Sequence, residues 1–81
     1  MSWTVYILQS QKDKSCYTGI TLNLKNRINF HNLGYSRYTS AKKPYELIWY
    51  CVFNSKKVAI DFEKYLKSGS GIAFRNKRLI K

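Results

Sequence analysis

Acidic residues are scarce in this sequence. Four Asp and Glu side chains stand against 15 Lys and Arg in 81 residues, which gives a formal net charge of +11. Solubility requires much less, so the imbalance favours a polyanionic partner, because bound cations release counterions from a phosphate backbone. Composition alone also allows a basic protein that binds any anionic surface and performs no chemistry of its own.

Cysteine is equally rare, with two residues in the chain. Cys16 and Cys51 fall in predicted strands and have neither the spacing nor the neighbours of a zinc site. A disulfide stays open on spacing alone, but two buried thiols in a reducing cytosol are the state that we expect.

Long apolar runs are missing as well. No run reaches membrane-spanning length, and the apolar segment at residues 3–8 is too short for the core of a signal peptide. No segment predicts the strongly amphipathic helix that binding to a membrane surface needs. We therefore expect a cytoplasmic protein with no membrane partner, folded as one domain over residues 1–81 with one modest core.

At the N-terminus the sequence predicts a β-hairpin. Residues 3–8 are rich in aromatic and β-branched side chains, as a buried strand requires, and the polar residues 9–15 allow the chain to turn. The second strand covers residues 16–19, and its closing glycine permits a sharp exit or a close approach to a phosphate. Tyr6 and Tyr17 then lie on neighbouring paired strands.

A first helix is predicted over residues 22–32, with Thr21 as its N-cap and Gly34 just beyond its end. Arg27 and His31 are four residues apart, so they lie on one face of this helix, beside its apolar stripe. Their side chains should emerge where the helix meets the sheet, at the edge of the surface that the hairpin tyrosines form.

The loop at residues 34–44 mixes basic and aromatic side chains, a composition that serves phosphate contact and base stacking. We expect it to bind nucleic acid through Arg37, Tyr38, Lys42 and Lys43. A solvated connector whose tyrosines cover the edge of the sheet is the alternative that the loop alone leaves open.

The second half of the chain begins with an apolar run at residues 45–53, which predicts a strand in the centre of the sheet, covered on both faces. A helix that Asn54 or Ser55 caps and that runs to about Ser68 then places Glu63 on the shoulder of its apolar stripe. An ordinary surface ion pair with Lys67, four residues on, explains that glutamate equally well.

The chain ends in a flexible break at residues 68–71 and a short basic helix at residues 72–81. This helix is expected to add three cations to a nucleic-acid surface: Arg75, Lys77 and Arg78. The order of elements predicts an α/β fold, a small three-stranded, mainly antiparallel sheet flanked by helices in the order β-β-α-β-α-α.

Two short motifs in the hairpin resemble a known signature. Thr4-Val5-Tyr6 and Tyr17-Thr18-Gly19 resemble the two halves of the signature of the GIY-YIG nuclease family. Arg27, His31 and Glu63 fall where that family carries its helical Arg and His and its metal-binding Glu. The resemblance covers nearly the whole chain and is closest to the small stand-alone bacterial members.

Three features depart from the family pattern. The first motif lacks its leading glycine, and Thr18 replaces the isoleucine of the second. A late asparagine that many members use near the site has no secure equivalent here, and Asn76 is the candidate.

The resemblance implies a metal-dependent DNA endonuclease. Hydrolysis of a phosphodiester needs an activated water, neutralisation of charge on phosphate oxygens and help for the leaving oxygen. The family assigns Tyr6 as general base, with a pKa that Arg27 and the metal-bound water would lower, and His31 as auxiliary acid or base. Tyr17 would position the phosphate or the nucleophile, and Arg27 would clamp the transition state. Glu63 would be the sole metal carboxylate, for one Mg²⁺ or Mn²⁺ ion.

The chain is too short for an added recognition domain, so we expect selectivity for DNA structure, or weak specificity, and a role in repair or recombination. A protein partner that supplies specificity and RNA as a substrate both stay open. Two rival functions remain: a catalytically inactive nucleic-acid-binding module of the same fold, and a basic interaction subunit of a larger repair assembly.

Overall fold

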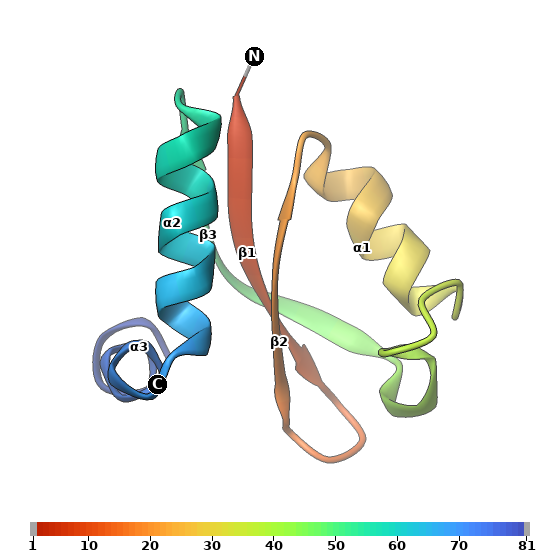
Figure 1. Ribbon diagram of the computed structural model, residues 1–81. Helices are drawn as coiled ribbons and strands as arrows, with labels where there is room; N and C mark the ends of the chain where they lie inside the picture. Colours follow the sequence, from red (N-terminus) through yellow and green to blue (C-terminus); the bar gives the residue numbers. More distant parts are fainter. Residues whose placement is uncertain (1, 81) are drawn as a thin grey trace.

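A computed structural model of the chain describes residues 2–80. Its elements in chain order are β1 (Trp3–Ser10), β2 (Cys16–Thr21), α1 (Leu24–Asn32), the 3₁₀ turn η1 (Ser40–Lys42), β3 (Tyr45–Phe53), α2 (Lys56–Lys67), α3 (Gly69–Phe74) and the π-helical turn η2 (Arg75–Leu79). The three strands form one antiparallel sheet in the order β2-β1-β3 (Figure 1). The expected fold class is therefore confirmed.

The central strand is β1, so the prediction that residues 45–53 form the central strand is wrong. Strand β3 lies at an edge of the sheet, and its apolar residues are not all covered: Tyr50 is 55% exposed and Val52 is 51% exposed. A register shift opposite Ile7 and Leu8 brings two consecutive residues, Ile48 and Trp49, into the same core. The continuous apolar run at residues 45–53 therefore results from this irregularity and from a partly exposed face, and not from burial on both faces.

Alternation along β1 divides the core between the two faces of the sheet. Val5 and Ile7 pack with residues of α2, whereas Tyr6 and Leu8 pack with residues of α1. Tyr17 pairs with Leu8 across the hairpin, so its side chain lies on the same face as that of Tyr6.

The start of α1 differs from the prediction, because Thr21 closes β2 and Asn23 is the N-cap. The Thr21 hydroxyl accepts the Asn23 N–H in a tight turn, and the Asn23 side chain accepts the Asn26 N–H at 3.1 Å. Both residues can cap a helix, and the local turn leaves that role to Asn23. Gly34 follows the end of α1 with a φ of +81°, as expected.

The last helix begins three residues before its predicted start, at Gly69, and ends in η2. The break from α2 is a single extended residue, Ser68, whose hydroxyl accepts the Gly71 N–H at 3.1 Å. A Cβ at Gly71 would collide with the Tyr65 carbonyl. This glycine therefore permits close packing between helices and does not mark a flexible linker. Ser55 caps α2, as expected.

Cys16 and Cys51 are free thiols, and both are half-buried rather than fully buried. Among the helices of residues 2–80, none has the length and apolarity needed to span a bilayer.

Candidate active site

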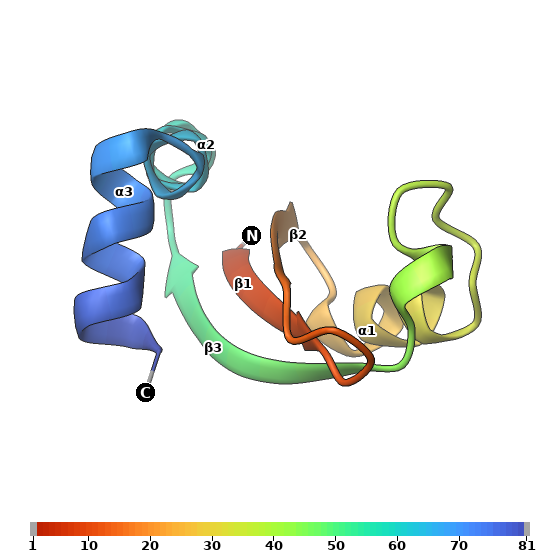
Figure 2. The same cartoon turned by 90° about the horizontal axis from the view of Figure 1, so that it is seen from below.

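Strand β2 forms one edge of the sheet and runs between α1 and α2 in both views (Figures 1 and 2). Helix α1 carries Arg27 and His31, and helix α2 carries Glu63. The two helices that carry these residues therefore lie on either side of β2.

Tyr6, His31 and Thr39 form a buried hydrogen-bonded chain. The Tyr6 hydroxyl lies 3.0 Å from Nε2 of His31, and Nδ1 of His31 lies 2.8 Å from Oγ1 of Thr39. All three residues are no more than 1% exposed. Both ring nitrogens thus have a hydroxyl partner, and these contacts hold the imidazole in one orientation.

Gly19 lies directly opposite Tyr6 in the hairpin, so β2 continues through this glycine to Thr21 and does not end there as predicted. A Cβ on Gly19 would lie 2.5 Å from Cζ of Tyr6. The absence of a side chain at this position therefore makes room for the phenol ring of Tyr6.

The substitution Gly19→Ala should lower the free energy of unfolding by about 1–3 kcal/mol, because the buried Tyr6 ring cannot move aside without strain. Gly69→Ala is the matched control, since nothing lies within 4 Å of its Cβ position. In the first turn of α3 it should stabilise by about 0.5–1 kcal/mol. Urea titration measures both values, and equal effects would contradict this account of Gly19.

Tyr17 is half-buried beside the Tyr6–His31–Thr39 chain. Its ring centroid is 4.9 Å from that of His31 and 6.4 Å from that of Tyr6. On its other side, Nζ of Lys67 lies 6.0 Å from the centroid of the Tyr17 ring. Tyr17 thus connects the α1 side of the site with α2.

Glu63 lies on α2, and its ion-pair partner Lys67 is the residue that approaches the Tyr17 ring. The side chain of Glu63 is only 13% exposed, and its carboxylate is ion-paired with Lys67, whose side chain is 52% exposed. The surface pair considered from the sequence therefore exists, but the carboxylate itself is largely shielded from solvent.

Arg27 is exposed on α1, and its guanidinium lies 5.2 Å from the centroid of the Phe30 ring. The structure therefore gathers Tyr6, Tyr17 and His31 in one cluster, with Arg27 one turn before His31 on α1 and Glu63 on α2.

Burial raises the pKa of the Tyr6 phenol well above its usual value of about 10. The neighbouring Tyr17 also raises it, the charge of Arg27 lowers it, and the charge of Glu63 raises it further. The expectation of a lowered Tyr6 pKa does not hold for the free protein, because desolvation outweighs the attraction of Arg27.

Burial lowers the pKa of His31 below its usual value, and the positive charge of Arg27 lowers it further. The imidazole is therefore neutral at pH 7, so one ring nitrogen can accept a proton. The protein thus holds a neutral phenol beside a neutral imidazole.

The described residues offer few protein ligands for a divalent cation. Within residues 2–80, no group of three or more His, Cys, Asp or Glu side chains could hold a metal. Glu63 offers a single shielded carboxylate, already beside a cation. Such a donor suits a hard divalent cation that takes most of its ligands from water and phosphate oxygens.

The seven other basic or aromatic residues expected to bind nucleic acid lie in two groups at opposite ends of the molecule (Figures 1 and 2). The loop group has Tyr38, which is 85% exposed, and Lys42, which forms an ion pair of 3.2 Å with Asp13. Its other members are Arg37 and Lys43, both exposed. The second group consists of Arg75, Lys77 and Arg78 in η2. This turn lies beyond α2, on the side away from α1.

Asn76, the candidate for the late family asparagine, also lies in η2. Its amide oxygen accepts a hydrogen bond of 3.1 Å from Nε of Arg75. The structure therefore does not bring this side chain to the Tyr6 cluster.

Two side chains of the site were not identified as functional from the sequence. Thr39 follows Tyr38 in a loop, and nothing local reveals that its hydroxyl reaches back to a helix. Lys67 was recognised as a partner of Glu63, but its approach to the Tyr17 ring depends on how α2 packs against β2.

The three-stranded antiparallel sheet and its flanking helices define a small α/β domain with a candidate active site beside β2. Residues 2–76 match the family profile described as the GIY-YIG catalytic domain, and the chain therefore belongs to the GIY-YIG family. This domain implies nuclease activity and hence a nucleic acid as substrate, and nucleases of this family generally depend on a divalent metal.

The chain is similar to UPF0213 proteins. It is 44% identical to one from Clostridium perfringens over 64 residues, which cover 78% of this chain and 68% of that protein. It is 41% identical over the same length to one from Streptococcus pyogenes serotype M5. The solution NMR structure of a UPF0213 protein from Bacillus halodurans matches with a TM-score of 0.60 and 31% identity, covering 98% of this chain and 87% of that one.

Proposed function

We propose that the protein is a metal-dependent DNA endonuclease that hydrolyses phosphodiester bonds at the site around β2. The observation that carries this proposal is the contact between the Tyr6 hydroxyl and a neutral, oriented His31, with Tyr17, Arg27 and Glu63 around it. Each group alone has a structural explanation, but together they offer a proton path, a guanidinium and a carboxylate, which are groups that hydrolysis needs.

The proton of the attacking water is proposed to pass through Tyr6 to His31. If Nδ1–H of His31 donates to the Thr39 hydroxyl, Nε2 is free to accept the phenolic proton of Tyr6. The Tyr6 oxygen is buried in the free protein, so this step requires that substrate binding admits a water to it. That oxygen then takes the proton of the water as its own proton moves to the imidazole. The raised pKa of Tyr6 makes such a coupled transfer more favourable than a free phenolate, which would require prior ionisation.

The charges of the site are proposed to act on the phosphate. Arg27 presents a planar guanidinium that can bind two phosphate oxygens and neutralise the charge that develops there. Glu63 would hold one Mg²⁺ or Mn²⁺ ion, which when bound supplies further neutralisation of the phosphate. Lys67 then leaves the carboxylate and can contact a phosphate oxygen, because its side chain is half-exposed and flexible.

Thr39 is proposed to act as a positioning residue through His31. Thr39→Val should lower the cleavage rate about tenfold, because Nδ1–H loses its acceptor and the imidazole can adopt the other tautomer. Thr39→Ser should restore most of the rate.

The rate–pH profile separates this role from a structural one. In the wild type the rate should fall on the acid side as His31 gains a proton, at a pH below 6.5 because the pKa of His31 is lowered. In Thr39→Val this fall should move to lower pH, since the imidazolium would bury an unpaired N–H. An unchanged profile with a lower melting temperature would leave Thr39 a purely structural role.

The substrate is proposed to be DNA with structural irregularities, such as flaps, branches or nicks, in repair or recombination. The loop group lies next to the site, because Thr39 of that loop is bonded to His31, and the η2 group would contact more distant phosphates. The match over residues 2–76 supports one such domain over residues 1–81. RNA as a substrate, a partner that supplies specificity and a cytoplasmic location stay predictions.

The proposal is tested with end-labelled DNA in single-stranded, duplex, nicked, flap and branched forms, with Mg²⁺, Mn²⁺ or EDTA. We expect cleavage of at least one form with a divalent metal and none with EDTA. Failure to cleave any DNA or RNA form under these conditions would contradict it.

A catalytically inactive binding module is the second candidate. It is favoured by Asn76, which lies away from the site, and by Lys67, which neutralises Glu63. In that case the DNA affinity should fall steeply with salt, as phosphate contacts require, and should not depend on a divalent metal.

A further inference from the structure

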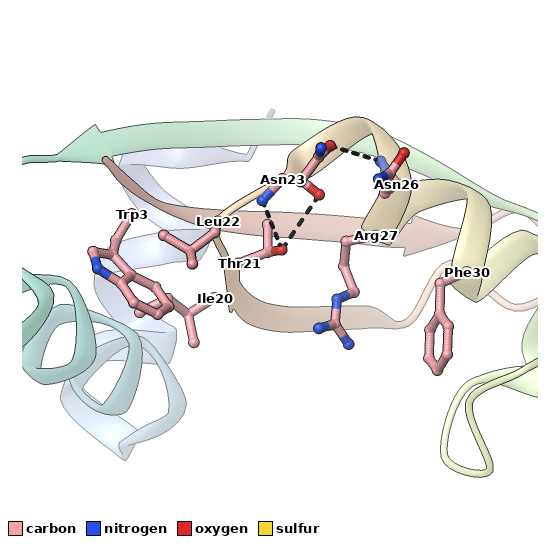
Figure 3. A pocket seen from close by; sticks show the side chains of 8 residues that line it. All are labelled: Trp3, Ile20, Thr21, Leu22, Asn23, Asn26, Arg27 and Phe30. Atoms are coloured by element: carbon pink, nitrogen blue, oxygen red, sulfur yellow. Dashed lines mark hydrogen bonds between the residues drawn. The ribbon is translucent and has the colours of Figure 1, made fainter. Parts of the chain in front are cut away.

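A hollow of about 470 Å³ opens beside Arg27, at the end of β2 (Figure 3). Trp3, Leu22 and Ile20 lie on one side of it, and Arg27 and Phe30 lie on the other. Its volume falls in the range of pockets for small ligands, roughly 300–1,000 Å³. The Tyr6–His31–Thr39 chain does not line this hollow, so the chemistry described above leaves it without a role.

The walls of this hollow are mainly apolar, and two of them are aromatic rings, those of Trp3 and Phe30. A flat heteroaromatic ring is the kind of group that stacks on such side chains. Leu22 is 45% exposed and would gain cover from a ligand. The lining therefore favours a nucleobase over a sugar or an ion alone.

Two cations lie at or near the hollow. Arg27 lines it, between Leu22 and Phe30 in Figure 3, and Nζ of Lys56 lies 5.0 Å from the centroid of the Trp3 ring. Within the described part of the chain, no carboxylate lines the hollow. A ligand that joins an aromatic ring to flanking negative charges can meet both cations, and a nucleotide within a strand has that form.

We propose that the hollow holds one unpaired nucleotide of the substrate, with the adjacent phosphate on Arg27 and the base against Trp3 and Leu22. This inference rests on the proposed function for the identity of the strand. A base that is paired and stacked in a duplex cannot enter, so the hollow would select sites with an unpaired base next to the bond that is cleaved.

The test uses Trp3 as its own reporter. The chain has two tryptophans, so Trp49→Phe leaves Trp3 alone, and Glu63→Gln in the same protein prevents cleavage. This protein is titrated with a ten-nucleotide single strand and with the blunt duplex of the same sequence. We expect the single strand to quench Trp3 fluorescence to saturation and the duplex to bind without that quench. A single strand that fails to bind, or binds without quenching, overturns the proposal.

A matched pair of substitutions locates the contact. Leu22→Asp places a negative charge in the hollow and should weaken binding of the single strand roughly tenfold. Val52→Asp makes a similar change at a residue that is 51% exposed on β3, at the other edge of the sheet, and should stay within about twofold. Equal weakening by both variants would contradict the site. Where Trp49→Phe destabilises the fold, a single 2-aminopurine in the oligonucleotide reports stacking in the protein that retains Trp49.

The two proposals fail separately. If quenching depends on Leu22 but the wild-type protein cleaves no nucleic acid, the nucleotide site is supported and the nuclease proposal is contradicted. If the wild-type protein cleaves DNA but the single strand does not quench Trp3, the nuclease proposal is supported and the nucleotide site is contradicted.

Discussion

Glu63→Gln should lower the rate of DNA cleavage roughly 1,000-fold, which corresponds to about 4 kcal/mol of transition-state stabilisation. The amide keeps the shape of the side chain but removes the charge that a divalent cation requires, and no other carboxylate of residues 2–80 completes a metal cluster. Single-turnover cleavage with saturating metal measures the effect. DNA affinity, measured by anisotropy in EDTA, should change less than threefold.

Asp61→Asn is the matched control for this change. Asp61 is on the same helix and also forms an i,i+4 ion pair, with Lys57 at 3.0 Å, but its side chain is 60% exposed. Its substitution should leave cleavage within about twofold, because exposed pairs of this kind contribute little. If Glu63→Gln cleaves DNA at the same rate as Asp61→Asn, Glu63 is not the metal ligand that we propose.

Tyr6→Phe should lower the cleavage rate about 100- to 1,000-fold, since it removes the hydroxyl that connects the water to His31. The ring stays in place over Gly19, so the free energy of unfolding should fall by about 1–3 kcal/mol, because the buried Nε2 of His31 loses its partner. Single-turnover rates and urea titration of the same preparations separate the two effects.

Tyr45→Phe provides the comparison. Tyr45 is also buried, at 7% exposed, and burial raises the pKa of its phenol too. The two substitutions remove the same group from similar surroundings, but the hydroxyl of Tyr45 has no role in the proposed proton path. If both variants lose activity to the same degree, the loss reports packing and not proton transfer.

Much of the fold could be predicted because its signals are local. The polar turn after β1, the Ser55 cap and the amphipathic pattern of α2 each depend on a few neighbouring residues. The errors arose where two local explanations compete or where packing decides. Thr21 and Asn23 are both good caps, and an apolar run such as residues 45–53 does not specify how many strands flank it.

The site was predictable only as a set of residue types. Helical spacing placed Arg27 and His31 on one face, but nothing in the sequence shows that Thr39 reaches the imidazole or that a tyrosine ring fills the space beside Gly19. These contacts join residues 8 and 13 positions apart, across a loop and a hairpin, and depend on tertiary packing. For the same reason the raised pKa of Tyr6 could not be anticipated, because burial is not a property of a single position.

The bond between Thr39 and His31 has a consequence for how the loop after α1 can vary among relatives. Surface loops ordinarily accept insertions and deletions at little cost. Here a change in length between Gly34 and Thr39 would displace the hydroxyl that orients the imidazole. Insertions in homologues should therefore accumulate elsewhere, for example in the turn between β1 and β2, and this segment should keep a constant length.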